Sequence, residues 1–82
     1  MDKKNSGVGV LDKAVRILGV LESGPHSLSE LVAATKIARP TAHRLAVALE
    51  FHRLVARDLN GRFILGPRSG ELSASAGEDR LL

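Results

Sequence analysis

The positively charged side chains of this sequence gather in its middle third. Residues 36–68 carry seven Lys and Arg side chains against two carboxylates, a balance of +5, whereas residues 1–35 sum to zero and residues 69–82 to −2. A directed positive field of this kind favours an anionic partner such as nucleic acid. A solvated basic surface without a partner is the alternative. The seven cations are Lys36, Arg39, Arg44, Arg53, Arg57, Arg62 and Arg68.

Several side chains in and near this segment can form specific contacts with DNA. Thr41 and Ser29 can donate hydrogen bonds to phosphate oxygens, and Arg44 can pair with a guanine edge or hold a phosphate. His43 can contact a base or a phosphate, and plain solvent exposure is the alternative for it and for Arg44. Val47 can touch a thymine methyl, although an isolated exposed valine needs no explanation.

Catalytic and metal chemistry are not expected. The sequence has no cysteine, and its three histidines lack both H-x-x-x-H spacing and a carboxylate cluster. A glycine-rich phosphate loop and a nucleophile–base pair are also missing. The only aromatic residues are Phe51 and Phe63, which argues against binding single strands by base stacking. With neither a long apolar segment nor a secretory signal, we expect a cytoplasmic, nucleoid-associated protein without cofactor, metal or membrane contact.

A first helix is predicted from Val10 to the Gly24-Pro25 pair, because glycine tolerates φ > 0 and proline cannot continue a helix. Its apolar residues form two neighbouring stripes, too wide for one interface. We expect one stripe to face the core and part of the other to face a partner chain; alternatively, both enter the core. The candidate dimerisation residues are Val10, Leu11, Ala14, Ile17, Leu18 and Leu21.

Two shorter helices follow. Ser27-Leu-Ser-Glu30 is a capping box, which predicts a second helix that ends near Ala34 or Thr35. A third helix is predicted from Arg39-Pro40 to Glu50, because proline at the first helical position loses no intrahelical bond. Its apolar face comprises Ala42, Leu45, Ala46 and Leu49.

After the third helix, the spacing of the apolar residues changes from a helical period to one typical of β-strands. Leu54–Asp58 and Arg62–Leu65 are β-rich runs on either side of an Asn60-Gly61 pair, which predicts a hairpin with a type I′ turn. A fourth helix is predicted from Arg68 to about Ala76, with Leu72 as its only large apolar anchor. The chain thus reads as a mainly α fold with a small β-hairpin.

Two short helices joined by a tight turn, with a hairpin behind them, are typical of a winged helix-turn-helix: a three-helix core, a wing and the start of a linker helix. We therefore predict sequence-specific binding of double-stranded DNA, with residues 40–50 in the major groove and the wing, 58–62, on the backbone or in the minor groove. The alternative is a winged-helix module for protein–protein assembly. The candidate DNA contacts are Ser27, Ser29, Lys36, Arg39, Pro40, Thr41, His43, Arg44, Asn60 and Arg62.

The order of the motifs resembles the N-terminal domain of IclR-family transcription regulators. The resemblance is carried by Leu11-Asp-Lys-Ala-Val-Arg-Ile-Leu18, Leu28-Ser-Glu-Leu31, Pro40-Thr-Ala-His-Arg-Leu45 and Arg62-Phe-Ile-Leu-Gly66. Within that family the chain looks most similar to the NdgR-type regulators of leucine and other amino-acid biosynthesis in actinobacteria.

The resemblance implies a homodimer that forms partly through the first helix and binds a palindromic operator. It also implies a linker helix toward a C-terminal domain that senses a small-molecule effector and that this chain does not include. The expected organisation is a flexible tail over residues 1–9, the DNA-binding domain over 10–66 and the linker helix over 67–82.

The sequence departs from the family at two turns. Lys36 and Arg53 stand where the family often has glycine, and each costs about 1 kcal/mol if its φ is positive. Two extra cations near the phosphates are the compensation we expect. Arg39 is a poor N-cap, and we expect its side chain to point at DNA instead.

Overall fold

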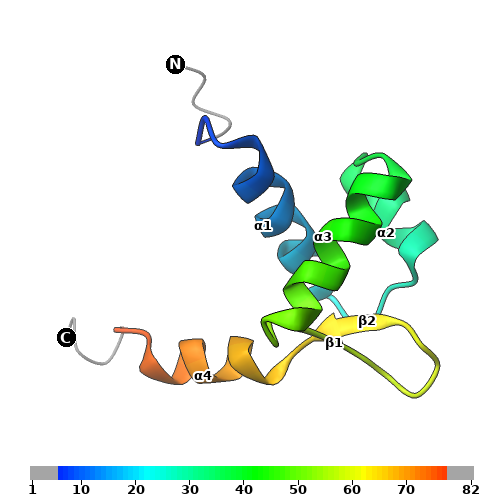
Figure 1. The fold of residues 1–82 in the computed structure, drawn as a ribbon. Helices are drawn as coiled ribbons and strands as arrows, with labels where there is room; N and C mark the ends of the chain where they lie inside the picture. The colour runs from blue at the N-terminus through cyan, green and yellow to red at the C-terminus, as the bar shows by residue number, and fades with distance from the viewer. Residues whose placement is uncertain (1–5, 78–82) are drawn as a thin grey trace.

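The computed structural model describes residues 6–77, which form three packed helices, a two-stranded hairpin and a fourth helix (Figure 1). The predicted flexible tail and linker helix therefore lie partly outside the described residues, at 1–5 and 78–82. The elements in chain order are α1 (Gly9–Leu21), α2 (Leu28–Thr35), α3 (Arg39–Phe51), β1 (Val55–Arg57), β2 (Phe63–Leu65) and α4 (Pro67–Ser75). This is the predicted winged helix-turn-helix architecture.

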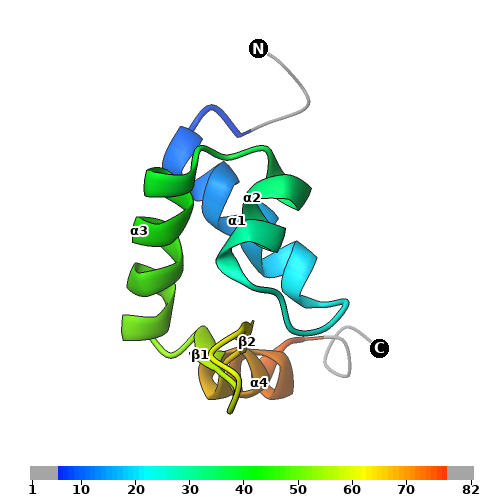
Figure 2. The ribbon, with the colours of Figure 1, turned by 90° about the vertical axis from the view of Figure 1, so that its right-hand side faces the viewer.

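The core lies where α1, α2 and α3 meet above the hairpin (Figure 2). The α3 side of it is built from small residues, Ala42 and Ala46, which let the helices approach closely, and from Leu49. This is the predicted apolar face, with Leu45 half-buried at its edge. The buried core residues are Ile17, Leu21, Leu31, Ile37, Ala42, Ala46, Leu49, Val55 and Phe63.

Helix α1 corrects the predicted dimer surface. Ile17 and Leu21 are 0% and 3% exposed and belong to the core, so their assignment to dimerisation is wrong. Ala14 and Leu18 pack against the core and are only partly accessible. The stripe that continues to the helix's N-terminal end remains exposed at Val10. A wide apolar arc on one helix does not reveal which part of it the other two helices cover.

The start of α1 also differs from expectation. The helix begins at Gly9, inside the segment predicted to be a flexible tail. Before it, Ser6 is held to the first turn: its backbone N–H and its hydroxyl both donate to the Asp12 carboxylate, the hydroxyl over 2.6 Å. Ser6 is therefore attached to the first turn of α1.

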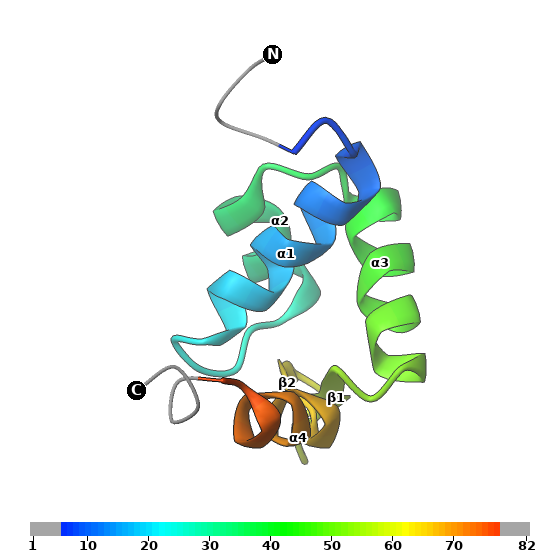
Figure 3. The same cartoon turned by 90° about the vertical axis from the view of Figure 1, so that its left-hand side faces the viewer.

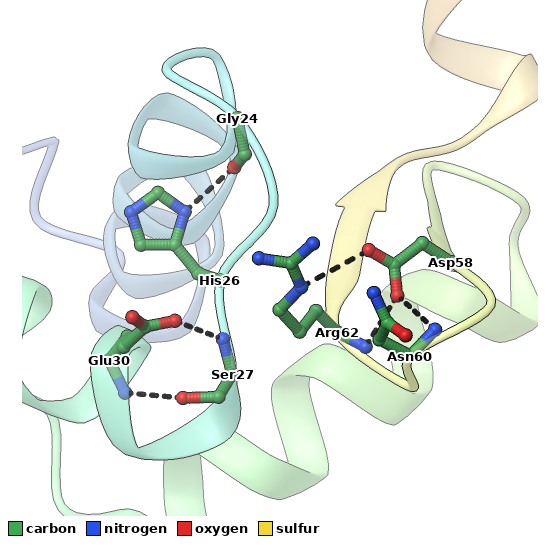
Figure 4. Close-up of polar contacts among 7 residues, drawn as sticks. All are labelled: Gly24, His26, Ser27, Glu30, Asp58, Asn60 and Arg62. Atoms are coloured by element: carbon green, nitrogen blue, oxygen red, sulfur yellow. Dashed lines mark hydrogen bonds and ion pairs between the residues drawn. The ribbon is translucent and has the colours of Figure 1, made fainter.

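The capping box at the start of α2 is confirmed (Figure 4). The Ser27 hydroxyl accepts from the Glu30 N–H at 3.1 Å, and the Glu30 carboxylate accepts from the Ser27 N–H at 2.7 Å. The hydrogen bond from the Ser27 backbone holds the pKa of Glu30 below its usual value. The pair satisfies two N–H groups that the first helical turn leaves without partners.

The hairpin forms, but its turn is not the predicted one. Arg57 pairs with Phe63, and Asp58 accepts from Gly61 N–H as well as donating to Arg62 O, so the loop has three residues. Gly61 has φ +79°, whereas Asn60 has no positive φ. A type I′ turn needs both, so that prediction is wrong. The Asp58 side chain directs the chain into a turn followed by a left-handed glycine.

The root of the hairpin is attached to the loop before α2. His26 forms a β-bridge with Phe63, and the two residues exchange both backbone hydrogen bonds, at 3.0 and 2.8 Å. No local sequence pattern indicates this contact, because His26 and Phe63 are far apart along the chain. The bridge fixes the hairpin beside the N-terminus of α2.

Helix α4 extends from the base of the molecule away from the hairpin tip (Figure 1). It has no buried residue, and Leu72, predicted to anchor it, is half-exposed. Polar contacts hold it instead: Arg68 N–H donates to Arg53 O and the Ser69 hydroxyl donates to Leu54 O. Gly66 permits this approach, because a Cβ there would lie 2.5 Å from the Arg53 carbonyl oxygen.

Candidate nucleic-acid interface

The turn between α2 and α3 is closed by a left-handed residue. Lys36 has φ +62° and Arg53, after α3, has φ +65°; no other non-glycine residue between 6 and 77 has a positive φ. Both are positions where the sequence departs from the family's glycine, so the expected strain is present at each. In return, the turn carries an exposed ammonium group next to the start of α3.

A remote arginine stabilises the same turn. The Arg16 guanidinium, on α1, donates to the Thr35 carbonyl oxygen at 2.9 Å. The Thr35 hydroxyl donates to Leu31 O and accepts from Ile37 N–H, and Ile37 is buried in the core. Arg16 thus helps to fix the angle between α2 and α3. This contact could not be predicted from the sequence, because no local pattern relates residues 19 positions apart.

The predicted contact residues on α3 face outward. Pro40, His43 and Arg44 are exposed and Thr41 is half-exposed, and α3 stands at one side of the bundle with its outer face uncovered (Figure 2). Within residues 6–77, neither Lys36 nor Arg44 makes a side-chain hydrogen bond or an ion pair. Their charge is available to an anion.

The N-terminal ends of α2 and α3 are joined by two of the predicted contacts. The Arg39 guanidinium donates to the Ser29 hydroxyl, so both side chains lie on one surface. Arg39 is the first residue of α3, and the N-cap is Ala38, which makes no side-chain cap. The arginine therefore has no capping role, and its side chain lies along the outside of the motif.

The predicted wing contacts are held by a carboxylate (Figure 4). Asp58 accepts from the backbone N–H groups of Asn60 and Arg62, at 2.8 and 2.9 Å, and from the Arg62 guanidinium at 3.2 Å. The Arg62 N–H is the main reason why the pKa of Asp58 lies below its usual value. Leu59, fully exposed at the tip, was not considered in the sequence analysis.

A second wing arginine is also engaged. Arg57 forms an ion pair with Glu50 on α3 at 3.3 Å, and its guanidinium lies 4.5 Å from the centre of the Phe63 ring. These contacts tie the hairpin to the end of α3. They also explain why charge counted along the sequence overstates the positive field of the wing.

The N-terminal end of α1 lies beside the start of α3 (Figure 3). Val10, Leu11 and Val15 are exposed large apolar side chains. A shallow groove separates this end of α1 from α3, and it contains a further cation, Lys13. Its lining residues are Val10, Lys13, Thr41, Arg44, Leu45 and Ala48.

Over 6–77, no three His, Cys, Asp or Glu side chains come together in a group that could hold a metal ion. None of the helices described is long and apolar enough to cross a membrane.

Comparison with known proteins places these features in a family. The model of the IclR helix-turn-helix domain matches residues 10–59. A search of curated proteins finds no match.

Solved structures of longer proteins share the fold. An IclR transcriptional regulator from Alicyclobacillus acidocaldarius is 26% identical with a TM-score of 0.81, over 89% of this chain and 31% of that one. The repressor BlcR from Agobacterium tumefaciens is 26% identical with a TM-score of 0.76, over 87% and 29%. An IclR-family regulator from Rhodococcus, at 24% identity and a TM-score of 0.76 over 94% and 31%, bears on the fold alone.

This chain spans about a third of the length of those proteins. The family match, however, covers more than half of this chain, and the three-helix core, wing and exposed α3 agree with it. The chain therefore belongs to the IclR family and carries its winged helix-turn-helix domain.

Proposed function

We propose that this domain binds double-stranded DNA sequence-specifically and thereby regulates transcription. The observation that carries the proposal is the surface formed by the starts of α2 and α3. Exposed cations at Lys36, Arg39 and Arg44 lie there without a carboxylate partner among the described residues, beside the donors Thr41 and Ser29. A helix with free donors at its N-terminal half suits the major groove of B-DNA.

The proposal assigns a role to each contact. Arg44 and His43 reach base edges from α3, while Lys36, Arg39 and Thr41 hold the phosphate backbone. The wing lies against the backbone or minor groove through Asn60 and Arg62. Ser27 and Ser29, at the start of α2, approach the adjoining phosphates.

We propose further that the protein acts as a homodimer on a palindromic operator. Val10 and Leu11, together with Val15, supply an exposed apolar surface on α1 that a second copy can cover. Two-fold symmetry then sets half-sites about one helical turn apart, or a multiple of it. Helix α4 begins the linker to a domain that binds the effector.

The identity of the target genes is proposed from the sequence resemblance alone. We propose that the target genes belong to amino-acid biosynthesis, as for the NdgR-type regulators that the sequence resembles. Chromatin immunoprecipitation of the intact regulator tests this: enrichment at such genes supports it, and enrichment elsewhere only would contradict it.

Fluorescence anisotropy on a pool of short duplexes, at two salt concentrations, tests DNA binding. We expect affinity to fall steeply with added salt, with a log–log slope of about −2 to −3 per protomer if two or three phosphates are neutralised. Repeated selection should enrich a palindrome. An interaction insensitive to sequence and nearly insensitive to salt would contradict the proposal.

The competing function is protein–protein assembly, favoured by the exposed apolar residues of α1. An apolar interface hardly responds to salt. Sedimentation of the protein alone gives its oligomeric state, and a stable dimer that ignores every duplex would support assembly instead.

A further inference from the structure

The outermost line of α3 has one charged residue, Arg44, and is apolar beyond it. Pro40, Arg44, Val47 and Phe51 are spaced by four, three and four residues, so all four project from the same side of the helix. This side is opposite to the buried residue Leu49. Beyond Arg44 its exposed members are a valine and a phenylalanine, 41% and 81% exposed. The proposed function does not use them.

We infer that Val47 reads thymine by contacting its C5-methyl group in the major groove. The inference rests on the proposed function and adds a base-reading residue to it. The thymine methyl is the apolar feature that distinguishes one base edge from the others in this groove. An exposed aliphatic side chain on the face that carries Arg44 fits that feature.

The position of Val47 along the helix suits this contact. At a rise of about 1.5 Å per residue, it lies about 4.5 Å further along α3 than Arg44. Neighbouring base pairs are about 3.4 Å apart, so the two side chains are close enough to reach neighbouring base pairs in one groove. Valine also strongly prefers one χ1 rotamer in a helix, and its methyl groups are therefore already oriented.

The surrounding charges leave this surface open to DNA. The nearest acidic residue along α3 is Glu50, and its carboxylate is engaged by Arg57 at 3.3 Å. His43 precedes Val47 by one helical turn and is exposed. DNA that enters against Arg44 and His43 is thus not repelled at Val47.

A protein partner on the same line is the competing occupant. Val47 and Phe51 are one turn apart and both exposed, but two side chains make a patch well below the several hundred Å² typical of such surfaces. The neighbouring cation at Arg44 favours an anionic polymer as well. We therefore assign Val47 to the duplex.

Replacing thymine by uracil tests the inference, because this change removes only the methyl group. Duplexes carrying the selected operator would be made with uracil at one thymine at a time, and binding of the whole chain measured by anisotropy. We expect about fourfold weaker binding at one or two positions per half-site. In Val47→Ala, binding to the thymine and uracil duplexes should become equal at those positions.

Leu72→Ala is the matched control, because it also truncates an exposed aliphatic side chain, on α4, and it should keep the full discrimination. If uracil weakens binding nowhere, or if Val47→Ala retains the difference, the inference is wrong while DNA binding stands. If no duplex is bound at all, the proposed function and the inference fall together. Circular dichroism confirms that each variant is folded.

Discussion

The helix-turn-helix and the segment that follows α3, with the wing and the start of α4, carry their positive charge in different ways. The three cations at the front of the motif, Lys36, Arg39 and Arg44, have no carboxylate partner in residues 6–77. All four that follow α3 are in ion pairs, with carboxylates at 2.9 to 3.3 Å. Those four are Arg53, Arg57, Arg62 and Arg68. The cations are thus left without a carboxylate in one region and stabilise internal contacts in the other.

The difference follows from what each region needs for its stability. The motif has a hydrophobic core beneath it, so its outer side chains are not required to hold it together. A two-stranded hairpin is marginal by itself. It is held instead by two ion pairs of its arginines, with Asp58 in the turn and Glu50 on α3, and by the backbone bridge from His26 to Phe63.

The largest expected effect is a loss of DNA affinity that differs between the helix-turn-helix and the wing. Arg44→Ala should weaken binding to the selected duplex by about 1–3 kcal/mol, and relax the preference at one base if Arg44 reads guanine. Arg62→Ala should cost less, because part of its charge is already neutralised by Asp58. Anisotropy titrations of both variants measure this. An equal loss for the two would show that the wing's ion pair opens on DNA.

A smaller effect concerns the strain at Lys36. Lys36→Gly should raise the free energy of unfolding by about 1 kcal/mol, because glycine adopts φ +62° without the steric cost that a Cβ brings. It should also make the salt slope of DNA binding shallower by about one unit, since one phosphate contact is lost. Urea denaturation and salt titration measure the two changes.

Arg53→Gly is the matched control for Lys36→Gly. Because Arg53 has φ +65°, its replacement by glycine should raise the free energy of unfolding by a similar amount. The loss of its exposed ion pair with Glu71 reduces this gain. It lies at the far end of α3, so the salt slope should stay unchanged. A loss of slope in both variants would mean that the whole basic segment contacts DNA.

Releasing a wing arginine should have a smaller effect still. Asp58→Asn keeps an oxygen that can accept from Asn60 and Arg62 N–H but removes the charge opposite the Arg62 guanidinium. We expect tighter DNA binding at low salt and a slope steeper by up to one unit. Glu50→Gln, which frees Arg57, is the comparison. Unchanged binding in Asp58→Asn would place the wing tip away from the phosphates.

The smallest effect is on stability at acid pH. The pKa values of Asp58 and Glu30 are lowered in the folded state from ordinary values of 3.8 and 4.5, chiefly by backbone N–H groups. The two ionised carboxylates contribute fully to the free energy of unfolding above about pH 4.5. This contribution is lost as the pH falls through their lowered folded-state pKa values. Thermal unfolding from pH 6 to 2.5 should show this decline, and Asp58→Asn should flatten part of it. An equally steep decline in that variant would assign the effect to other carboxylates.

The helices were predictable because their signals are local. The Ser27–Glu30 box, the Gly24-Pro25 stop and the proline at position 40 act within one helical turn, and α2 and α3 begin within a residue of expectation. The type I′ turn was wrong for a similarly local reason: the preference of Asn-Gly was outweighed by the Asp58 carboxylate two residues earlier. The sequence does not show which of two such neighbouring preferences decides the type of turn.

The exposure of the candidate contact residues was predictable, whereas the contacts that support them were not. The contact residues on α3 are exposed as expected, because their spacing puts them opposite the apolar face. That Ile17 and Leu21 are core residues, and that Arg16 supports the turn through Thr35 O, depends on how three helices meet. Helical periodicity describes one helix at a time and contains no information on its neighbours.

By itself, the sequence determined the order of elements, the face of α3 that is buried and the family to which the chain is similar. The first two follow from hydrogen bonds and apolar contacts among residues a few positions apart, and the third follows from the residues of the motifs and their order. Only the tertiary structure decided which stripe of α1 enters the core and which arginines remain free. Burial and ion pairing depend on distances in space, and Arg53 and Glu71, 18 positions apart, meet at 2.9 Å only because Gly66 lets α4 return beside the end of α3.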